Sequence, residues 1–355
     1  MKRHLVAVCF VLASLVVALP AVADPPCTGD PSVASPLSLT VAGETAEGLY
    51  ALPSGPPKGI VVFAHGYGHT VESWRTHLTR TATQDGVVAV AMNYRGTEIL
   101  PPATPGGLPQ SRGWQVAEGA EDSIAAARHF SDDCPTAHTI VMYGVSMGGN
   151  ASGLAVAAGA TRANGRPLFD FWVDIEGATN VTETYHEARL VGLSGNAFAV
   201  NAAADIEREM GGTFEQVPQR YLERSVVTRA GDMAAAGLKG VILVHGVDDG
   251  LVPHNQSREM VAALAAAGIP AEMNTVLTRE PGTEPGTTLT GTVLGGTGQY
   301  ESPFAGHASE ASTTHTVGMR GFAVLSRLLR EKAVWCGEFV LDGSTGSTVS
   351  ARATC

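Results

Sequence analysis

Five short, almost wholly apolar runs alternate with helix-like segments along this chain, and this alternation constrains the fold more than any other feature. A run of strand length without polar alternation is typical of a strand that is buried on both faces. The runs are residues 59–64, 87–92, 139–143, 169–173 and 241–244. Segments with helical spacing follow at residues 71–84, 115–131, 147–160 and 254–267. The alternation predicts an α/β fold in which helices flank both faces of a mostly parallel central sheet.

Two segments interrupt this alternation. Residues 177–236 lie between two buried strands, and their mixed, mostly helical pattern predicts a cap inserted over the carboxyl edge of the sheet. Residues 279–300 are rich in Gly, Thr and Pro, which predicts an extended excursion or a small hairpin. We therefore expect an irregular lead-in at residues 24–36, a core made of residues 37–176 and 237–335, and a C-terminal tail at residues 336–355.

The first 23 residues have the pattern of a cleaved secretion signal. A basic start at Lys2 and Arg3 is followed by a nearly unbroken apolar run from Leu5 to Leu19. This run of about 15 residues is shorter than the roughly 20 that a membrane-spanning helix needs. Small residues at positions 21 and 23 fit a signal-peptidase site. We expect cleavage before Asp24 and a secreted protein with no stable membrane anchor.

Cysteine usage agrees with an oxidising compartment. Cys9 lies in the signal segment, and an even number of cysteines remains after it. Among the possible connectivities we favour Cys27–Cys134 together with Cys336–Cys355, which would tie down the C-terminal tail. No C-x-x-C or Cys/His spacing typical of a metal site is present, so we predict no metal site.

Composition excludes two further classes of protein. Hydrophobic residues make up 44% of the chain and charged residues 16%, which is too apolar for a disordered protein. The formal net charge is −11, so the basic surface of a nucleic-acid-binding protein is absent. We expect no nucleic-acid partner and no cofactor. The sequence leaves the oligomeric state open, and we favour a monomer.

The motif Gly144-Val145-Ser146-Met147-Gly148 follows a buried strand and opens a helix. In this context a G-x-S-x-G sequence is typical of a nucleophile elbow, a sharp turn that holds a serine hydroxyl clear of the backbone. The helix that follows points the positive end of its dipole at the serine. We therefore predict that Ser146 is a nucleophile. The alternative is a glycine-rich turn that only packs tightly.

A serine nucleophile needs a base and a carboxylate that orients the base, and both are expected later in the chain. The strand at 241–244 is followed by Asp248 and Asp249, and either carboxylate is a candidate. The alternative for both is a side chain that stabilises a turn. Asp174 and Glu176, which follow the preceding strand, are weaker candidates.

His307 is the candidate base because it lies in a loop directly before a helix expected at residues 309–332. A loop histidine at this point can turn into the site, whereas one within a helix usually packs or faces solvent. His315, expected within that helix, is therefore second. His65 and His245 each precede a glycine at a strand end, where we expect structural hydrogen bonds.

Acyl transfer also needs hydrogen-bond donors for the oxyanion that develops on the substrate. One donor is expected to be the backbone N–H after the nucleophile, which is that of Met147. The other is expected in the loop that follows the strand at 59–64, where we choose the backbone N–H of Tyr67.

These motifs resemble those of the α/β-hydrolase superfamily over roughly residues 40–335. The His65-Gly-Tyr-Gly68 loop and the elbow are similar to those of secreted serine esterases, including cutinase-like polyester hydrolases. The resemblance implies an α/β-hydrolase fold, with Tyr67 and Met147 as the oxyanion donors.

A second resemblance is to the catalytic domain of the prolyl-oligopeptidase-type family. It is carried by residues 93–96, 221–225, 241–253 and 256–257. In that family the acid is the fifth residue of an H-G-x-x-D-x-x-V pattern, which implies Asp249 rather than Asp248. The long cap and the long segment between Asp249 and His307 depart from the family pattern.

We therefore expect a secreted serine hydrolase that cleaves small-molecule or polymeric carboxylic esters through an acyl-enzyme. The apolar cap residues 190–193 and Phe198 indicate an acyl or aromatic pocket, or else cap packing. The alternative is a serine peptidase of prolyl-oligopeptidase type, with charged cap residues such as Glu183, Glu187 and Arg189 at a peptide terminus. A non-catalytic binding protein of this fold would lack a triad residue, and none is missing here.

Overall fold

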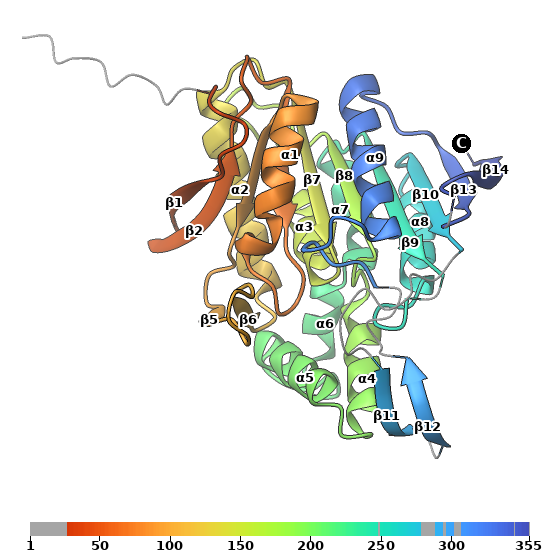
Figure 1. Ribbon diagram of the computed structural model, residues 1–355. Helices are drawn as coiled ribbons and strands as arrows, with labels where there is room; N and C mark the ends of the chain where they lie inside the picture. The colour runs from red at the N-terminus through yellow and green to blue at the C-terminus, as the bar shows by residue number, and fades with distance from the viewer. Residues whose placement is uncertain are drawn as a thin grey trace, which may run out of the picture.

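A ten-stranded sheet forms the centre of the computed structural model, which describes residues 27–247, 249–277, 307–343 and 345–354 and the backbone of residues 288–293 and 296–301. Its strands are β1 (Ser35–Val41), β2 (Glu44–Ala51), β3 (Gly59–Ala64), β4 (Val88–Met92), β7 (Thr139–Val145), β8 (Phe171–Ile175), β9 (Gly240–Gly246), β10 (Ala271–Val276), β13 (Gly337–Leu341) and β14 (Thr348–Ala353). Their spatial order is β1-β2-β4-β3-β7-β8-β9-β10-β13-β14 (Figure 1). Neighbours from β4 to β13 pair in parallel, and β1, β2 and β14 pair antiparallel at the edges. The mostly parallel sheet predicted from the sequence is confirmed.

Helices cover both faces of this sheet, as the alternation of the sequence predicted. They are α1 (Arg75–Asp85), which follows the short η1 (Val71–Trp74), α2 (Val116–Asp133), α3 (Met147–Ala157), α8 (Asn255–Ala266) and α9 (Thr316–Glu331). Successive side chains of β3 point to opposite faces. Ile60 and Val62 pack in the cluster that contains α2, α3 and α8, whereas Val61 and Phe63 pack in the cluster that contains α1 and α9.

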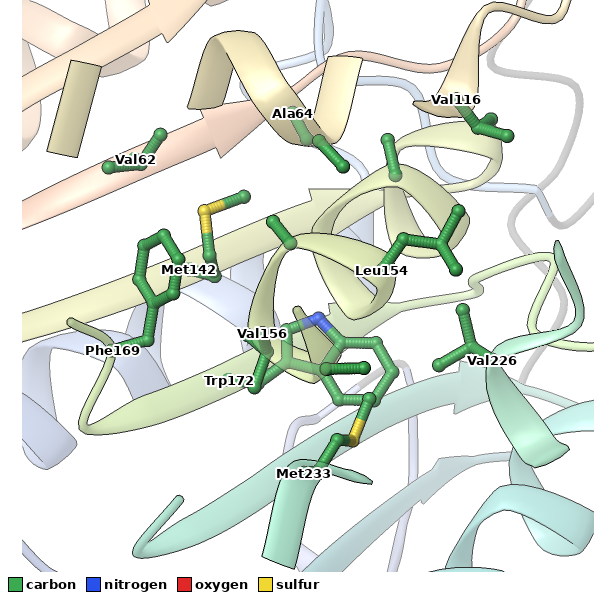
Figure 2. Packing of buried hydrophobic residues seen from close by; sticks show 14 of the residues in the cluster. Val62, Ala64, Val116, Met142, Leu154, Val156, Phe169, Trp172, Val226 and Met233 are labelled. Carbon is green, nitrogen blue, oxygen red and sulfur yellow. The ribbon is translucent and has the colours of Figure 1, made fainter. Parts of the chain in front are cut away.

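Close packing around Trp172 of β8 fixes α3 on the sheet. The Trp172 ring is fully buried and donates a hydrogen bond from Nε1 to Ser152 Oγ at 2.9 Å. Figure 2 shows this ring with Val156 of α3, Val226 and Met233 around it. A Cβ at Gly153 would lie 2.5 Å from a methyl carbon of Val226, so α3 approaches this cluster as closely as a glycine allows. The start of α3, which carries the elbow serine, is therefore held by a rigid core.

The inserted segment forms several helices, of which α4 to α6 lie beyond one end of the sheet (Figure 1). They are α4 (Val181–Gly192), α5 (Ala197–Met210), α6 (Pro218–Arg224), the short η2 (Val226–Arg229) and α7 (Ala230–Ala235). Helices α4 and α5 pack on each other, and α7 packs against α3 and α8. The cap proper is therefore α4 to α6, and the end of the insertion rejoins the core.

The C-terminal segment is part of the sheet, which corrects our expectation of a separate tail at residues 336–355. β13 pairs with β10, and β14 pairs with β13. At the other end, the expected Cys27–Cys134 disulfide is present, with a Cα–Cα distance of 5.7 Å. It joins the N-terminal lead-in to the residue that ends α2. Cys355 lies outside the described residues, so the Cys336–Cys355 bridge stays a prediction.

The last helix begins later than predicted, and His315 lies at its N-cap rather than within it. α9 starts at Thr316, and residues 309–315 form turns instead of the helical start expected at 309. The Ser312 hydroxyl accepts hydrogen bonds from the backbone N–H groups of Thr314 and His315, at 3.3 and 3.0 Å. Such local side-chain bonds compete with helix formation.

Strand β10 was not predicted from the sequence, because it contains buried polar residues. Glu272 and Asn274 interrupt its apolar pattern, yet both are fully buried. Glu272 pairs with Arg327 of α9, and Asn274 accepts hydrogen bonds from Arg320 of the same helix. The polar residues are thus satisfied by α9, and this pairing is invisible in the sequence of the strand alone.

Several expectations fall on residues outside the described ones, including the secretion signal at residues 1–23 and the Asp248 side chain. Two small antiparallel pairs are described, β5 (Glu98–Leu100) with β6 (Gln110–Arg112), and β11 (Thr288–Val293) with β12 (Gly296–Glu301). The second pair lies where the sequence predicted an excursion or hairpin. Within the described part of the chain, no helix has both the length and the apolar character needed to cross a membrane.

Candidate active site

Ser146 occupies a strained turn between β7 and α3. Its backbone has φ 58° and ψ −125°, a conformation that residues with a side chain rarely adopt. The flanking glycines make the turn possible. A Cβ at Gly144 would lie 2.2 Å from the carbonyl oxygen of Gly148, and one at Gly148 would lie 2.1 Å from that of Ala64. This geometry is that of a nucleophile elbow.

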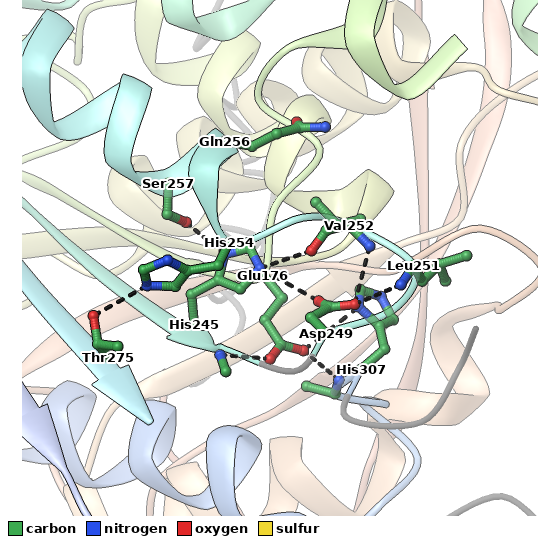
Figure 3. A network of polar contacts seen from close by, with 12 residues as sticks. Glu176, His245, Asp249, Leu251, Val252, His254, Gln256, Ser257, Thr275 and His307 are labelled. Carbon is green, nitrogen blue, oxygen red and sulfur yellow. Dashed lines mark hydrogen bonds and ion pairs between the residues drawn. The ribbon is translucent and has the colours of Figure 1, made fainter. Parts of the chain in front are cut away.

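Asp249 and His307 form a hydrogen-bonded pair (Figure 3). Nδ1 of His307 lies 2.7 Å from Oδ2 of Asp249, and both side chains are almost wholly buried. Nε2 of His307 is buried and has no hydrogen-bond partner among the described residues. The structure thus brings together the predicted base and the acid implied by the family resemblance. It leaves the other ring nitrogen available to a serine hydroxyl.

The Asp249 carboxylate is held by its own loop. Its Oδ1 accepts hydrogen bonds from the backbone N–H groups of Leu251 at 2.8 Å and Val252 at 3.0 Å. Burial acts to raise the pKa of Asp249, but the attraction of His307 and hydrogen bonding to His245 and His307 bring this pKa below its usual value. Asp249 is therefore ionised at neutral pH, as an orienting carboxylate must be.

Three other histidines considered from the sequence, His65, His245 and His315, are buried. His245 shares its ring nitrogens between Ser257 Oγ at 2.7 Å and the Val252 carbonyl at 2.9 Å. His65 contacts the Gly66 carbonyl through Nδ1 at 3.0 Å. Burial lowers the pKa of His65 and that of His315 to about 4, so both are neutral at physiological pH. These contacts match the structural role expected for His65 and His245.

The loop after β3 passes directly over Ser146. A Cβ at Gly66 would lie 3.3 Å from the Ser146 Cβ, and Gly68 has φ +82°. The N–H of Met147 is at the first position of α3, where a helix leaves its amides without internal partners. The predicted donors, Tyr67 and Met147, therefore stand on the two segments that flank Ser146.

Glu310 is a site residue that sequence analysis missed. Its side chain is buried, and Oε1 accepts a hydrogen bond from the Gly66 N–H at 2.6 Å. This bond ties the loop of Tyr67 to the loop of His307 across 244 residues of sequence. In the sequence, Glu310 is marked only by its position three residues after His307. That position does not indicate a hydrogen bond to Gly66.

An apolar cavity of about 240 Å³ lies between Ser146 and the cap. Tyr67 is fixed at its wall, because its hydroxyl donates to Asp205 of α5 at 2.6 Å. Its ring packs edge-on against Phe198, with centroids 5.3 Å apart. The other lining residues are Trp114, Thr184, Glu187, Ala188, Leu190, Val191, Asn196, Ala199, Ala202, Gly250, Leu251, Val252 and Pro253. The pocket expected from Phe198 and residues 190–193 is therefore present, with Leu190 and Val191 in its wall.

One group of side chains in the described residues has the composition of a metal site, namely Glu176, Asp249 and His307. Nδ1 of His307 and Oδ2 of Asp249 are already hydrogen-bonded to each other. A cation at this place would have to replace the bond that orients the histidine. We therefore interpret Asp249 and His307 as a candidate acid–base pair rather than as metal ligands.

Asp174 lies at the end of β8 below the elbow helix, and it is not part of the acid–base pair. A Cβ at Gly149 of α3 would be 2.2 Å from its Oδ1. Burial raises the pKa of Asp174 to about 8, with the nearby Gly177 amide opposing the shift. The folded protein therefore binds a proton that the unfolded chain releases near its ordinary pKa of 3.8.

We predict that Asp174→Asn stabilises the fold, and more so at pH 8 than at pH 5. An acid whose pKa is raised on folding lowers stability as pH increases between the unfolded and folded values, by at most about 1.4 kcal/mol per pH unit. Urea unfolding at both pH values measures this difference. Asp132→Asn, at an exposed position of α2, is the control and should change stability little at either pH. If the difference in free energy of unfolding between Asp174→Asn and the wild type does not grow with pH, the raised pKa of Asp174 is contradicted.

Comparison with known proteins gives the same fold. Residues 72–280 match a model described as the prolyl oligopeptidase family. An esterase from Pyrobaculum calidifontis superposes with a TM-score of 0.51 and 19% identity, covering 68% of this chain and 75% of that one. An acylaminoacyl peptidase in complex with Z-Gly-Gly-Phe-chloromethyl ketone gives 0.50 and 17%, covering 69% and 37%. The acylaminoacyl peptidase of Pyrococcus horikoshii gives 0.49 and 17%, covering 68% and 36%.

The chain thus spans little more than a third of the length of the acylaminoacyl peptidases and most of the esterase. At these identities the likeness supports the α/β-hydrolase fold alone. No curated protein matches the sequence. The family match covers the elbow, the cap and the loop of Asp249, and it ends before His307.

Proposed function

Because this chain belongs to the prolyl oligopeptidase family, we propose that it is a secreted serine hydrolase that cleaves carboxylic esters through an acyl-enzyme. Family membership makes the chain a serine hydrolase of the α/β-hydrolase fold. We further propose the ester substrate, the roles of the site residues and secretion. The proposed oxyanion loop and the elbow are similar to those of cutinase-like esterases. We expect no cofactor, no nucleic-acid partner and a monomeric enzyme.

The proposed reaction gives one role to each of Ser146, His307 and Asp249. The serine oxygen attacks the acyl carbon while Nε2 of His307, which has no hydrogen-bond partner among the described residues, accepts its proton. Asp249 keeps the imidazole oriented and stabilises its protonated form. His307 then passes the proton to the leaving alcohol, and water releases the acid by the same steps.

The backbone N–H groups of Tyr67 and Met147 are the proposed donors to the oxyanion. Met147 lies at the positive end of α3, and Tyr67 lies on a loop held by Glu310 and, through its side chain, by Asp205. Rigid donors of this kind stabilise the charge that appears in the transition state without further rearrangement. The two anchors therefore support a preorganised oxyanion site.

The apolar lining of the cavity beside Ser146 is the observation that carries the ester proposal. Its wall is built mainly from aromatic and aliphatic side chains of the cap and the Asp249 loop. Such a surface gains free energy when it covers an apolar acyl or aromatic group. We expect the substrate to place this group under α4 and α5 and to leave the ester carbonyl at Ser146.

Initial rates on p-nitrophenyl esters from acetate to palmitate, beside a proline p-nitroanilide, test this proposal. We expect ester turnover with an optimum below palmitate, because a chain longer than the cavity leaves part of its surface in water. The anilide should be turned over much more slowly. Anilide turnover with negligible ester turnover would overturn the ester assignment and leave the peptidase.

Secretion is supported by the N-terminal pattern and by the Cys27–Cys134 disulfide. Disulfides persist in oxidising compartments and are rare in a reducing cytosol. The proposed location is outside the cytoplasm, after cleavage before Asp24. N-terminal sequencing of the protein recovered from culture medium or periplasm tests it, and retention of residues 1–23 would contradict it.

A peptidase acting on short peptides is the second candidate, and one observation favours it. Glu187 of α4 lines the cavity, and it has no hydrogen bond or ion pair with other described residues. Burial and the charges of Glu183, Asp249 and Glu259 raise the pKa of Glu187 to about 8. A cationic amine in the cavity would favour the ionised form of this carboxyl group.

If the chain is a peptidase, Glu187→Gln is expected to raise KM about tenfold for an aminoacyl p-nitroanilide at pH 8. Loss of a charge-assisted hydrogen bond to the substrate amine weakens binding by about this factor. KM for the N-acetylated substrate should not change. Glu215→Gln, at an exposed position of the cap outside the cavity lining, is the matched control. Equal KM changes for both substrates would exclude Glu187 as the site of amine recognition.

A further inference from the structure

Glu176 stands at the centre of the site although the proposed reaction does not use it. It follows β8 with φ 49°, a left-handed backbone that costs free energy for a residue with a side chain. Its side chain is fully buried. A strained residue with a buried carboxyl group needs compensation from its surroundings, and the contacts of this carboxyl group supply it.

The two carboxyl oxygens of Glu176 connect the acid loop with the base loop. Oε1 accepts a hydrogen bond from the N–H of Gly246, the last residue of β9, at 2.9 Å. Oε2 accepts one from the N–H of Ala308, which follows the base. Oε2 also lies 3.5 Å from Nδ1 of His307. One side chain thus joins the ends of the segments that carry Asp249 and His307 (Figure 3).

Two buried carboxyl groups this close do not both ionise at neutral pH. One ring nitrogen of His307 and one carboxyl oxygen each of Glu176 and Asp249 lie within 4.8 Å of one another. Burial and the Asp249 charge raise the pKa of Glu176 well above its usual value, and a side-chain hydrogen bond with Asp249 adds to the shift. His245 and His307 are the titratable groups that contact Asp249, and no Lys or Arg is among the described groups that act on Glu176.

We propose that Glu176 is a positioning residue which, as a neutral carboxylic acid, donates a hydrogen bond to the Asp249 carboxylate and holds the Asp249 and His307 loops in register. It takes up and releases no proton during the reaction. The Ser146 proton moves to Nε2 of His307, and the Glu176 O–H stays on Asp249. This inference rests on the proposed roles of Ser146, Asp249 and His307.

Two variants separate a positioning role from a charge effect. Glu176→Ala removes the connection between the loops, and a misplaced base is expected to lower kcat about 100-fold with little change in KM. Glu176→Gln keeps a neutral donor and an acceptor in the same place. It is expected to retain kcat within about fivefold of wild type and to move the acid limb of kcat/KM by less than about 0.3 pH unit.

The measurements are kcat, KM and the pH profile on one p-nitrophenyl ester, with unfolding followed for each variant. Asp174→Asn, which lies in β8 two residues before Glu176 and outside the triad contacts, is the matched control and should keep wild-type kcat. An acid limb that moves by about one pH unit in Glu176→Gln would show an ionised carboxylate and overturn the proposal. Wild-type kcat in Glu176→Ala would also overturn it. Because Glu176→Gln decides between neutral and ionised forms, the test stands even if Glu176→Ala does not fold.

A parallel assay of Ser146→Ala keeps this inference apart from the proposed function. If Ser146→Ala retains ester turnover, the proposed function fails. If Ser146→Ala is inactive and both Glu176 variants behave like wild type, only the inference fails.

Discussion

Replacement of Ser146 by alanine is expected to lower kcat for ester hydrolysis by about 10⁴- to 10⁶-fold, the loss that follows removal of a serine nucleophile. In the proposed reaction the hydroxyl oxygen of Ser146 forms the bond to the acyl carbon, and alanine has no oxygen at this position. Rates on p-nitrophenyl butyrate, corrected for spontaneous hydrolysis, measure the loss. Ser32→Ala, an exposed hydroxyl in the N-terminal lead-in, should leave the rate unchanged.

Stability provides an independent check of the same residue. Alanine at position 146 keeps the strained φ of 58°, so Ser146→Ala should unfold near the wild-type midpoint. Glycine adopts this conformation freely, and Ser146→Gly should be about 1 kcal/mol more stable while equally inactive. A folded Ser146→Ala protein with full ester activity would contradict the assignment of the nucleophile.

Asp249→Asn is expected to lower kcat by about 10⁴-fold without unfolding the protein. The amide oxygen can still accept the hydrogen bonds from Leu251 and Val252, so the loop keeps its shape. The negative charge beside Nδ1 of His307 is lost, and the protonated imidazole that forms during acylation loses its stabilisation. Steady-state kinetics and near-ultraviolet circular dichroism measure the two effects separately.

Asp248→Asn is the natural control, because the sequence alone leaves both carboxylates open as the acid. Its kcat should stay within about threefold of wild type, as expected for a residue without a role in proton transfer. A larger loss in Asp248→Asn than in Asp249→Asn would reverse the assignment. The comparison also tests the pattern of the prolyl oligopeptidase family, which implies Asp249.

Local rules made the elbow predictable from sequence. A glycine two positions on either side of Ser146 has a steric cause that holds wherever a strand turns sharply into a helix, and the Cβ contacts of Gly144 and Gly148 show that cause directly. The apolar runs predicted strands β3, β4, β7, β8 and β9 for the same reason, since a strand buried on both faces needs no partner to be recognised.

Contacts between distant residues were not predictable in this way. Glu176 reaches Ala308 across 132 residues, and Glu310 reaches Gly66 across 244. A single glutamate in a loop has no pattern around it that indicates such a partner. Strand β10 was hidden for a related reason, because Glu272 is satisfied by Arg327 of a helix far along the chain. The Asp249–His307 contact was expected only because a serine nucleophile needs both an acid and a base, since no local pattern between the two residues indicates it.

The most direct test of the account is covalent trapping of the nucleophile. The purified protein is incubated with a fluorophosphonate, and the adduct is counted by intact mass and located by peptide mapping. We expect one equivalent per chain, on Ser146, formed far more slowly in His307→Ala and not at all in Ser146→Ala. A folded, ester-hydrolysing protein that forms no adduct, or carries it on another residue, would contradict the central claim.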